Sequence, residues 1–335
     1  LSAWLVECLL QFLEWCAALP GALWQQHVPP PWAIALALVG VAWALAPRGT
    51  PSRLCALALL APAFLFPPPS PREGEAWITT LDVGQGLAVL VRTQHRTLVY
   101  DAGPAFGPEA DSGGRIILPA LRAAGVERID LLVLTHEDLD HIGGAVTILE
   151  SLPVDRLASS LAPEHPVHAL APQWSPCTAG SAWEWDDVRF RFLSPDPAMR
   201  IARRNDSSCV LRVETAGGAM LLTGDIEKPA EAYLLGAPAV LKSDVLLVPH
   251  HGSRTSSTSE FISAVAPRWA VVPVGYLNRF GHPNADVLAR YRSAGIELLR
   301  TDRQGAVHVI LGAEGATVAT ERALRPRYWR APGSG

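Results

Sequence analysis

Charged side chains are almost absent from the first 66 of the 335 residues, whereas the rest of the chain has the polarity of a soluble protein. The whole chain also lacks a basic excess, because its formal net charge is −4. This balance argues against a protein that coats nucleic acid through bulk positive charge, and it leaves open a local basic strip. No repeat of fixed period is found, which argues against a solenoid. The sequence therefore predicts a membrane-associated segment followed by a globular domain.

The five cysteines have no spacing typical of a metal site. Three lie in apolar stretches near the N-terminus, which leaves Cys177 and Cys209 in the globular part. A bridge between these two would require an oxidising compartment. We interpret them as two buried free thiols.

The N-terminal segment contains three apolar runs, at residues 1–19, 32–46 and 54–66. The first carries its polar residues on roughly one helical face, as an interfacial amphipathic helix does. The other two are uncharged but shorter than the roughly 20 residues that a bilayer requires. Spanning would therefore depend on tilt or local thinning. We predict short membrane-associated helices over residues 1–66.

Two arginines predict the orientation of this segment. Arg48 and Arg53 lie between the second and third apolar runs, whereas residues 20–31 contain no lysine or arginine. Basic loops favour the cytoplasm, so the following domain is expected on the outer face of the membrane. The chain starts at Leu1 rather than methionine and has no signal-peptide pattern. We interpret it as the C-terminal part of a larger membrane protein.

After residue 66 the chain is predicted to comprise a proline-rich linker at 67–76, a folded domain at 77–315 and a basic tail at 316–335. Two arginine clusters are interpreted as solvated surface, namely Arg200, Arg203 and Arg204, and Arg322, Arg325, Arg327 and Arg330.

Short strand patterns come first in the domain and then alternate with helices, which fits an α/β fold of the α+β type. Two sheets sandwiched between helices fit this order better than a doubly wound parallel sheet. Strands are expected at 77–83, 87–92, 97–100, 131–134, 189–193, 209–214, 219–222, 245–248, 269–274 and 307–311. Helices are expected at 116–124, 145–152, 227–235, 257–265 and 285–294.

The strongest chemical signal is the run of residues 135–144, THEDLDHIGG, directly after a buried strand pattern. His136, Asp138, Asp140 and His141 offer imidazole and carboxylate groups that can converge on one or two divalent ions. The two glycines allow a tight turn into a helix. The alternative, a polar loop with a capped helix start, leaves these four side chains without a role.

Three later loops add candidate ligands, and each follows an apolar strand pattern. Asp225 provides a carboxylate suited to bridging two metals, the pair His250 and His251 provides imidazole, and His282 lies on a Gly-His-Pro turn. Each motif alone is also typical of an ordinary turn. Their common position at strand ends favours a single site.

Together these motifs resemble the metallo-β-lactamase superfamily, and more closely the C-terminal hydrolase-like domain of the ComEC family, inner-membrane proteins of DNA uptake in natural competence. The resemblance runs from about residue 77 to 311. Its further marks are LDVGQG at 81–86, YDAG at 100–103, NDSS at 205–208, TGD at 223–225, HHGSRTSS at 250–257 and GHP at 281–283. It implies an αββα sandwich preceded by short membrane helices.

The resemblance also implies a set of metal ligands. His136 and Asp138 would hold one divalent ion and Asp140 and His141 the other, with Asp225 as a bridge.

The late loop and the supporting groups are implied in the same way. His251 is the implied ligand, with His250 as the alternative, and Asp101 would orient a ligand. Asp138 stands where the superfamily commonly has imidazole, and Asn205 begins a loop that often supplies another histidine. The cofactor is therefore one or two divalent ions, zinc or manganese, with manganese favoured by oxygen ligands.

The reaction that the resemblance implies is metal-assisted hydrolysis of a DNA phosphodiester, in the strand that is not imported. Asp140 or Asp138 would orient or deprotonate water, and His282 would protonate the leaving oxygen. The residues expected to contact phosphate are Ser253, Arg254, Thr255 and Ser256.

Two other classes of function remain open at this point. The fold could hydrolyse a small ester, amide or thioester, as much of the superfamily does. It could also guide DNA without cutting it. DNA, the inner membrane and other competence proteins are the partners that the resemblance implies, and no oligomeric state follows from the sequence.

Overall fold

The computed structural model describes residues 2–19, 22, 26–47, 49–199, 204–236 and 241–327. The chain divides into two compact units, one of residues 1–69 with 121–125 and the other of residues 70–120 with 126–335. Residues 328–335 of the tail lie outside the described residues. So do four arginines singled out in the sequence, namely Arg48, Arg200, Arg203 and Arg330.

The N-terminal unit is helical. It contains α1 (Ser2–Ala17), α2 (Pro31–Ala44), η1 (Cys55–Leu60) and α3 (Ala61–Leu65). The second helix packs against the last two, and Gly40 permits this approach because a Cβ there would lie 2.6 Å from the Ala56 carbonyl oxygen. Among the helices described, none combines the length and the hydropathy needed to cross a bilayer.

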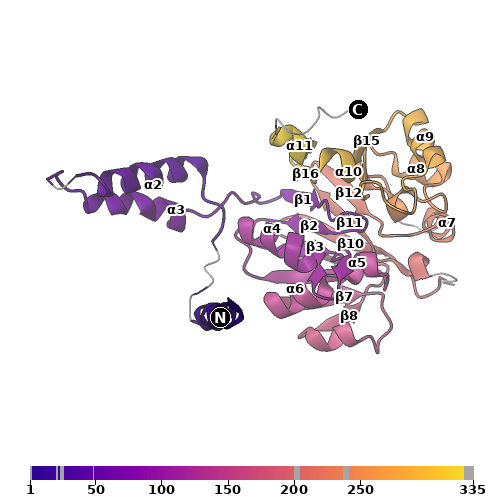
Figure 1. Ribbon diagram of the computed structural model, residues 1–335. Coiled ribbons are helices and arrows are strands. Elements are labelled where there is room, and N and C mark those ends of the chain that lie inside the picture. Colours follow the sequence, from indigo (N-terminus) through magenta and orange to yellow (C-terminus); the bar gives the residue numbers. More distant parts are fainter. Residues whose placement is uncertain are drawn as a thin grey trace. The chain divides into compact units, whose positions relative to one another are not determined.

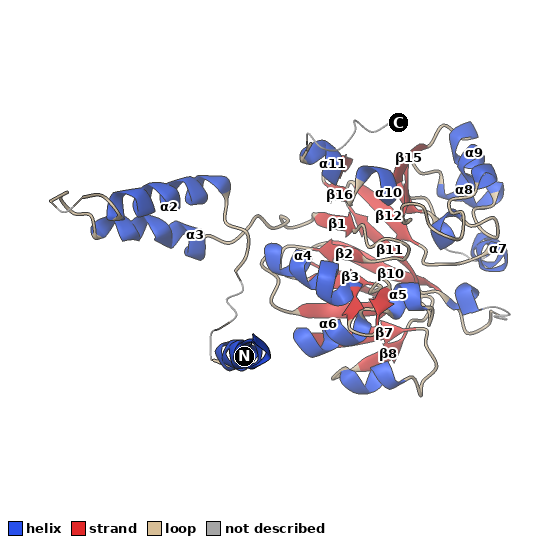
Figure 2. Ribbon diagram, viewed as in Figure 1, coloured by secondary structure: helices blue, strands red, loops and turns tan. Residues whose placement is uncertain are grey.

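Two sheets form the centre of the second unit (Figure 2). Among the described residues, the first sheet has eight strands in the order β17 (Gly315–Thr320), β16 (Val307–Gly312), β1 (Ala76–Thr80), β2 (Val89–Arg92), β3 (Thr97–Tyr100), β6 (Ile129–Leu134), β7 (Val154–Ser159) and β8 (Trp174–Pro176). The second has seven, in the order β15 (Glu297–Arg300), β14 (Trp269–Val272), β13 (Val245–Leu247), β12 (Gly218–Leu222), β11 (Val210–Thr215), β10 (Val188–Ser194) and β9 (Ala182–Trp185). A small hairpin of β4 (Ala105–Gly107) and β5 (Ala110–Asp111) stands apart.

The main core lies between the sheets. Its members alternate along the strands, as Ala76 and Ile78 do in β1 and Phe190 and Phe192 do in β10. The strand β6 is buried along its whole length, which explains its continuous apolar pattern. Burial of this apolar surface is the main stabilising contribution to the sandwich.

Helices cover the outer faces of both sheets. Figure 1 shows α6 (Ala145–Ser151) on one side of the strands, and α7 (Lys228–Gly236), α8 (Ser259–Val265) and α9 (Ala285–Ser293) on the other. Leu234, Phe261 and Tyr291 from the latter three join a second buried cluster with β12, β13 and β14. Shorter helical segments are η2 (Gly113–Ile117), α4 (Leu118–Ala123), α5 (Leu139–Ile142), η3 (Pro166–Leu170), η4 (Arg204–Ser207), η5 (Pro249–Gly252), α10 (Thr301–Gln304) and α11 (Glu321–Leu324).

The strand directions bring one set of loops together. Because β12, β13 and β14 are parallel, the loops that follow them leave the same edge of the second sheet. The loop after β6 leaves the first sheet beside them, as its contacts with Asp225 show. This edge positions the candidate site.

The predicted sandwich of two sheets between helices is confirmed. The predicted C-terminal boundary differs from the structure, because residues 315–320 form β17, which pairs with β16 along the sheet edge. The basic tail therefore begins after this strand rather than at 316.

The prediction of two free thiols is wrong. Cys177 and Cys209 form a disulfide, and both residues are buried. Cys177 follows β8 of the first sheet and Cys209 precedes β11 of the second, so the bridge joins the two sheets covalently. The pairing depends on packing between sheets, which spacing along the chain does not reveal.

Candidate metal centre

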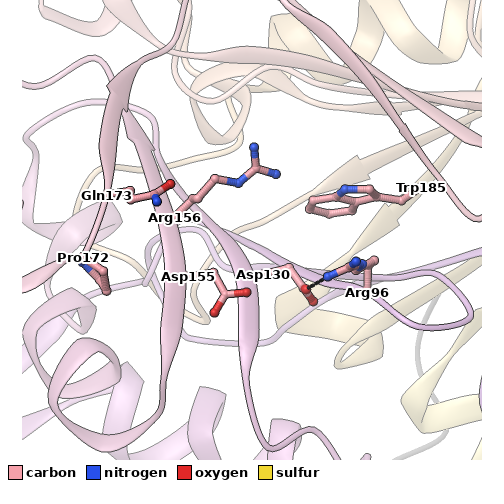
Figure 3. Close-up of a pocket in the computed structure, with 7 residues that line it drawn as sticks. All are labelled: Arg96, Asp130, Asp155, Arg156, Pro172, Gln173 and Trp185. Carbon is pink, nitrogen blue, oxygen red and sulfur yellow. Dashed lines mark hydrogen bonds and ion pairs between the residues drawn. The ribbon is translucent and has the colours of Figure 1, made fainter.

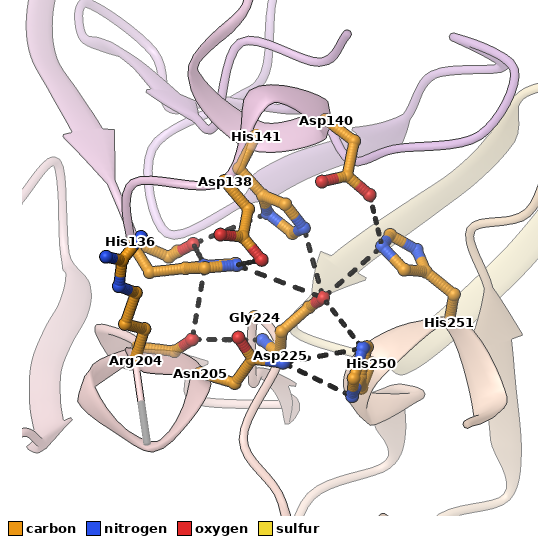
Figure 4. A network of polar contacts seen from close by, with 12 residues as sticks. His136, Asp138, Asp140, His141, Arg204, Asn205, Gly224, Asp225, His250 and His251 are labelled. Atoms are coloured by element: carbon orange, nitrogen blue, oxygen red, sulfur yellow. Dashed lines mark hydrogen bonds and ion pairs between the residues drawn. The ribbon is translucent and has the colours of Figure 1, made fainter. Parts of the chain in front are cut away.

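Four histidines converge on the carboxylate of Asp225 (Figure 4). The Nε2 atoms of His141 and His251 lie 3.2 and 3.4 Å from its Oδ2 atom. The Nε2 atoms of His250 and His136 lie 3.7 and 4.0 Å from the same oxygen. This carboxylate, at the end of β12, is therefore the centre of the site.

Supporting hydrogen bonds fix the orientation of two of these rings. The Nδ1 atom of His251 donates to the Pro273 carbonyl oxygen at 2.7 Å, and the Nδ1 atom of His141 lies 2.7 Å from Asp101 Oδ2. In each ring, Nε2 is left facing Asp225. Partners of this kind set the tautomer and direction of metal-binding histidines.

Several buried atoms at the centre have no hydrogen-bond partner among the described residues. They are His136 Nε2, His141 Nε2, His251 Nε2 and Asp225 Oδ1. Buried polar groups are nearly always satisfied, so a cluster of unsatisfied ones requires an explanation. Imidazole nitrogen and carboxylate oxygen are ligands of zinc and manganese, and the cluster fits one or two divalent cations.

The geometry defines two candidate ligand groups among the described residues, namely His136 with His141 and Asp225, and Asp140 with His141 and His251. The structure therefore brings His141 into both groups.

The two aspartates of the motif lie at the edge of the centre. Asp138 has a side chain 45% exposed, with Oδ2 3.6 Å from His136 Nε2. Asp140 is less exposed, and its Oδ2 lies 3.4 Å from His251 Nε2. Both carboxylates can therefore be reached by water as well as by a cation.

Charge coupling dominates the electrostatics of the metal-free cluster. Burial acts to raise the pKa of Asp225, but the charges of His141 and His251 outweigh it and hold this pKa well below its usual value. Burial likewise opposes ionisation of Asp140, yet the close contact with His251 Nε2, together with the charges of His141 and His251, lowers its pKa to about 2. Both carboxylates are therefore ionised at neutral pH and suited to hold a cation.

The backbone is strained where it presents these side chains. His250 and His251 have φ angles of 50° and 53°, and Asp101 has φ of 59°. Non-glycine residues in the left-handed region cost about 1–3 kcal/mol each and concentrate at functional sites. The turn directs both rings of the histidine pair toward Asp225.

Several supporting residues were missed by sequence reasoning. The buried Glu227 has Oε1 3.4 Å from His250 Nδ1. The Oγ atom of Ser208 accepts the Asp225 backbone N–H at 3.1 Å, and Thr135 Oγ1 lies 2.9 Å from His136 Nδ1. Thr135 and Ser208 lie in the THEDLDHIGG and NDSS motifs, where no role was predicted for them, and the signal for Glu227 was an acidic residue two positions after Asp225.

The four residues predicted to contact phosphate have different surroundings in the structure. Ser256 is buried, and its hydroxyl donates to the Pro249 carbonyl oxygen at 2.8 Å, so it supports the histidine turn. Thr255 Oγ1 lies 3.3 Å from His250 Nδ1 and 2.9 Å from Ser253 Oγ, whereas Arg254 is exposed. Of the four, Thr255 contacts a histidine of the centre and Ser253 contacts Thr255.

His282 lies next to the histidine pair, and the centroid of its ring is 5.8 Å from that of the His250 ring. Burial, followed by the charges of His251 and His250, lowers the pKa of His282 to about 4. Its imidazole is neutral at neutral pH and can donate a hydrogen bond to a leaving oxygen more readily than a proton.

Asp101→Asn is expected to lower the affinity for divalent cation roughly 10–100-fold, the range typical of supporting partners. Asparagine tolerates the left-handed backbone and can still accept the Thr135 backbone N–H, which Asp101 Oδ1 accepts at 2.8 Å. It removes the negative charge beside His141 Nδ1. Isothermal titration with Mn²⁺ and Zn²⁺ measures the effect, and unchanged affinity would mean that Asp101 serves only the backbone.

A separate cavity of about 480 Å³ lies at the opposite end of β6 (Figure 3). It is lined by Arg96, Asp130, Asp155, Arg156, Pro172, Gln173 and Trp185. Arg96 Nη1 and Asp130 Oδ1 form an ion pair at 2.7 Å. None of the candidate metal ligands lines this cavity.

The sequence was compared with protein families and with known proteins. Residues 81–275 match the metallo-β-lactamase superfamily. Competence protein ComA of Neisseria gonorrhoeae is 39% identical over 98% of this chain and 45% of its own length. ComE operon protein 3 of Bacillus subtilis is 33% identical over 73% of this chain and 34% of its own length. The chain thus spans less than half the length of these curated relatives.

Among solved structures, that of Igni18, a metallo hydrolase from Ignicoccus hospitalis, covers 72% of this chain and 98% of its own. The sequence identity is 18% and the TM-score is 0.46.

Proposed function

The chain belongs to the metallo-β-lactamase superfamily as a domain of the ComEC family of competence proteins, and from this premise we propose that it hydrolyses DNA phosphodiester bonds during DNA uptake. The observation that carries the proposal is the cluster of unsatisfied imidazole and carboxylate atoms around Asp225. The competence relatives favour DNA over other substrates of a hydrolase site. Cleavage of the strand that is not imported is the role that we propose.

The residues that would hold a cation are the two ligand groups around Asp225 and His141, with Asp138 at the exposed edge. Divalent zinc or manganese would supply Lewis acidity, which lowers the pKa of water and stabilises negative charge on a phosphoryl oxygen.

Side chains of the chain itself would then position the reacting groups. Asp140 is ionised and partly exposed, so it can accept a hydrogen bond from an attacking water or take its proton. Asp138 is the alternative for this role. His282 would donate a hydrogen bond to the leaving oxygen, and Ser253 and Thr255 would donate hydroxyl hydrogen bonds to phosphate.

The chemistry of the site is compatible with a second class of substrate, a small ester or thioester. The third class, a module that guides DNA without cutting it, is disfavoured by the four imidazoles that meet at one carboxylate. A surface that only guides DNA would not require this arrangement.

Asp140→Ala is expected to abolish cleavage of end-labelled single- and double-stranded DNA by the full chain in the presence of Mn²⁺ or Zn²⁺. Removing the carboxylate takes away the group proposed to orient water and one candidate ligand of the second group. The matched control is Glu137→Gln, because the Glu137 carboxylate pairs with Arg204 at 2.6 Å rather than with the cluster. Equal cleavage by wild type and the Asp140 variant would exclude the proposed role, and activity on small esters alone would favour the second class.

We also propose that residues 1–66 associate with the bacterial inner membrane and that the hydrolase domain lies on its outer face. Large apolar side chains are exposed along α1 and α2, including Trp4, Phe12 and Leu38 at 64%, 56% and 66%. Such surface favours contact with lipid or with other apolar helices. As part of the same proposal, the partners of this chain are DNA and other proteins of the competence apparatus.

A further inference from the structure

The loop between β14 and α9 exposes aromatic side chains next to the metal centre. This rim loop, residues 275–283, carries Tyr276 and Phe280, which are 77% and 54% exposed. Neither ring belongs to the two buried hydrophobic clusters, so these aromatic side chains do not contribute to the core. Exposed aromatic side chains grouped together commonly mark a binding surface.

The rim loop is held in place by its own side chains. Asn278 Nδ2 donates to the carbonyl oxygens of Gly275 and His282 at 3.1 and 2.7 Å, and Asn278 Oδ1 accepts the His282 N–H at 3.0 Å. Leu277 has φ of 49°, a strained value for a branched side chain. The loop therefore presents its aromatic rings from a defined turn.

A short series of ring contacts leads from this surface to the centre. The ring of Phe280 stacks on that of His282 at 5.9 Å with an interplanar angle of 14°. The ring of His282 in turn lies 5.8 Å from that of His250, whose Nε2 atom is 3.7 Å from Asp225. A polymer with one phosphate at the centre would thus place its neighbouring units over the rim loop.

Positive charge accompanies the aromatic surface. The guanidinium carbon of the exposed Arg279 lies 4.9 Å from the centroid of the Phe280 ring. Arginine next to an exposed aromatic ring matches the two components of a strand with unpaired bases, because bases stack on aromatic faces and phosphates pair with guanidinium. A duplex hides its base faces and offers only phosphates and groove edges.

We propose that the rim loop is a stacking platform for unpaired bases beside the scissile phosphate, with Tyr276 and Phe280 as the stacking residues and Arg279 as a phosphate contact. This inference rests on the proposed function, and it narrows the substrate class to single-stranded nucleic acid or single-stranded ends.

The test measures binding and cleavage separately, using the full chain with Tyr276→Ala and Phe280→Ala combined. Fluorescence anisotropy gives the Kd for a labelled single-stranded oligonucleotide and for the same strand made entirely of abasic residues. Loss of stacking is expected to weaken binding of the normal strand roughly five- to 150-fold per base and to leave the abasic strand unaffected. The matched control is Leu277→Ala, an apolar side chain of the same loop that is 84% exposed.

The outcomes are distinguishable. An equal Kd for the normal strand in wild type and double variant, or an equal loss for both strands, would overturn the stacking platform. A loss in Leu277→Ala as large as in the double variant would also overturn it, because that result indicates general apolar contact. Cleavage of both strands is measured in parallel with Mn²⁺, and its absence in wild type would overturn the proposed function while the binding difference still decides the platform.

Discussion

Asp225→Asn is expected to remove both cation binding and hydrolysis while the chain remains folded. Asparagine has the same shape, so packing at the end of β12 is preserved. The substitution removes the charge on which four imidazoles converge, at distances of 3.2 to 4.0 Å from Asp225 Oδ2. Loss of a supporting partner typically costs roughly 10–100-fold in affinity, and loss of this central group is expected to cost more.

The size of this effect can be measured directly. Cation content per chain is determined by mass spectrometry, and hydrolysis is followed with labelled DNA, where a fall of roughly 10²–10³-fold or more is expected. The matched control is Asp130→Asn. Asp130 is a buried carboxylate near the start of β6, in the cavity of Figure 3, whereas the candidate ligands His136 and His141 follow the end of that strand. Full cation binding by the Asp225 variant would contradict the proposed centre, and equal loss in both variants would indicate a folding defect.

Cys177→Ala combined with Cys209→Ala is expected to give the largest loss of stability among the changes considered. The bridge closes a separation of 32 residues, which corresponds to about 3–4 kcal/mol of stabilisation in the chain-entropy description. It also joins the two sheets next to Ser208, whose Oγ atom accepts the Asp225 backbone N–H. Thermal unfolding followed by circular dichroism should show the midpoint falling by roughly 10 °C.

A reducing agent provides the control for this experiment. It should lower the unfolding midpoint of the wild type, given time to reach the buried bridge, and leave that of the alanine variant unchanged. Equal midpoints for oxidised wild type and variant would show that the bridge contributes no stability.

Sequence patterns predicted the sandwich because strands buried on one or both faces have distinctive patterns. The continuously apolar run at 131–134 forms most of β6 (Ile129–Leu134), and 77–83 overlaps β1 (Ala76–Thr80), whose buried residues alternate. Five strands of the two sheets, β7, β8, β9, β15 and β17, were not predicted. Each has charged or small residues that interrupt its apolar pattern, and each is stabilised by pairing with a neighbouring strand rather than by its own composition.

The candidate ligands could be predicted because they follow apolar strands in recognisable motifs. A single site was expected from their common position at strand ends, and the structure gives the reason, because β12, β13 and β14 are parallel and end at one edge. Glu227 carries no motif of its own, and Ser208 belongs to the NDSS motif, for which no supporting role was predicted; the positions of both depend on how the loops pack around Asp225. The disulfide was mispredicted for the same reason, because Cys177 and Cys209 belong to different sheets.

The most direct test of the account is the metal dependence of DNA cleavage by the full chain. The protein is treated with a chelator, assayed with end-labelled DNA, and assayed again after addition of Mn²⁺ or Zn²⁺. The account predicts that cleavage disappears with the chelator and returns with one or both cations. Cleavage that persists in excess chelator, or that no added cation restores, would contradict a metal-dependent site at Asp225.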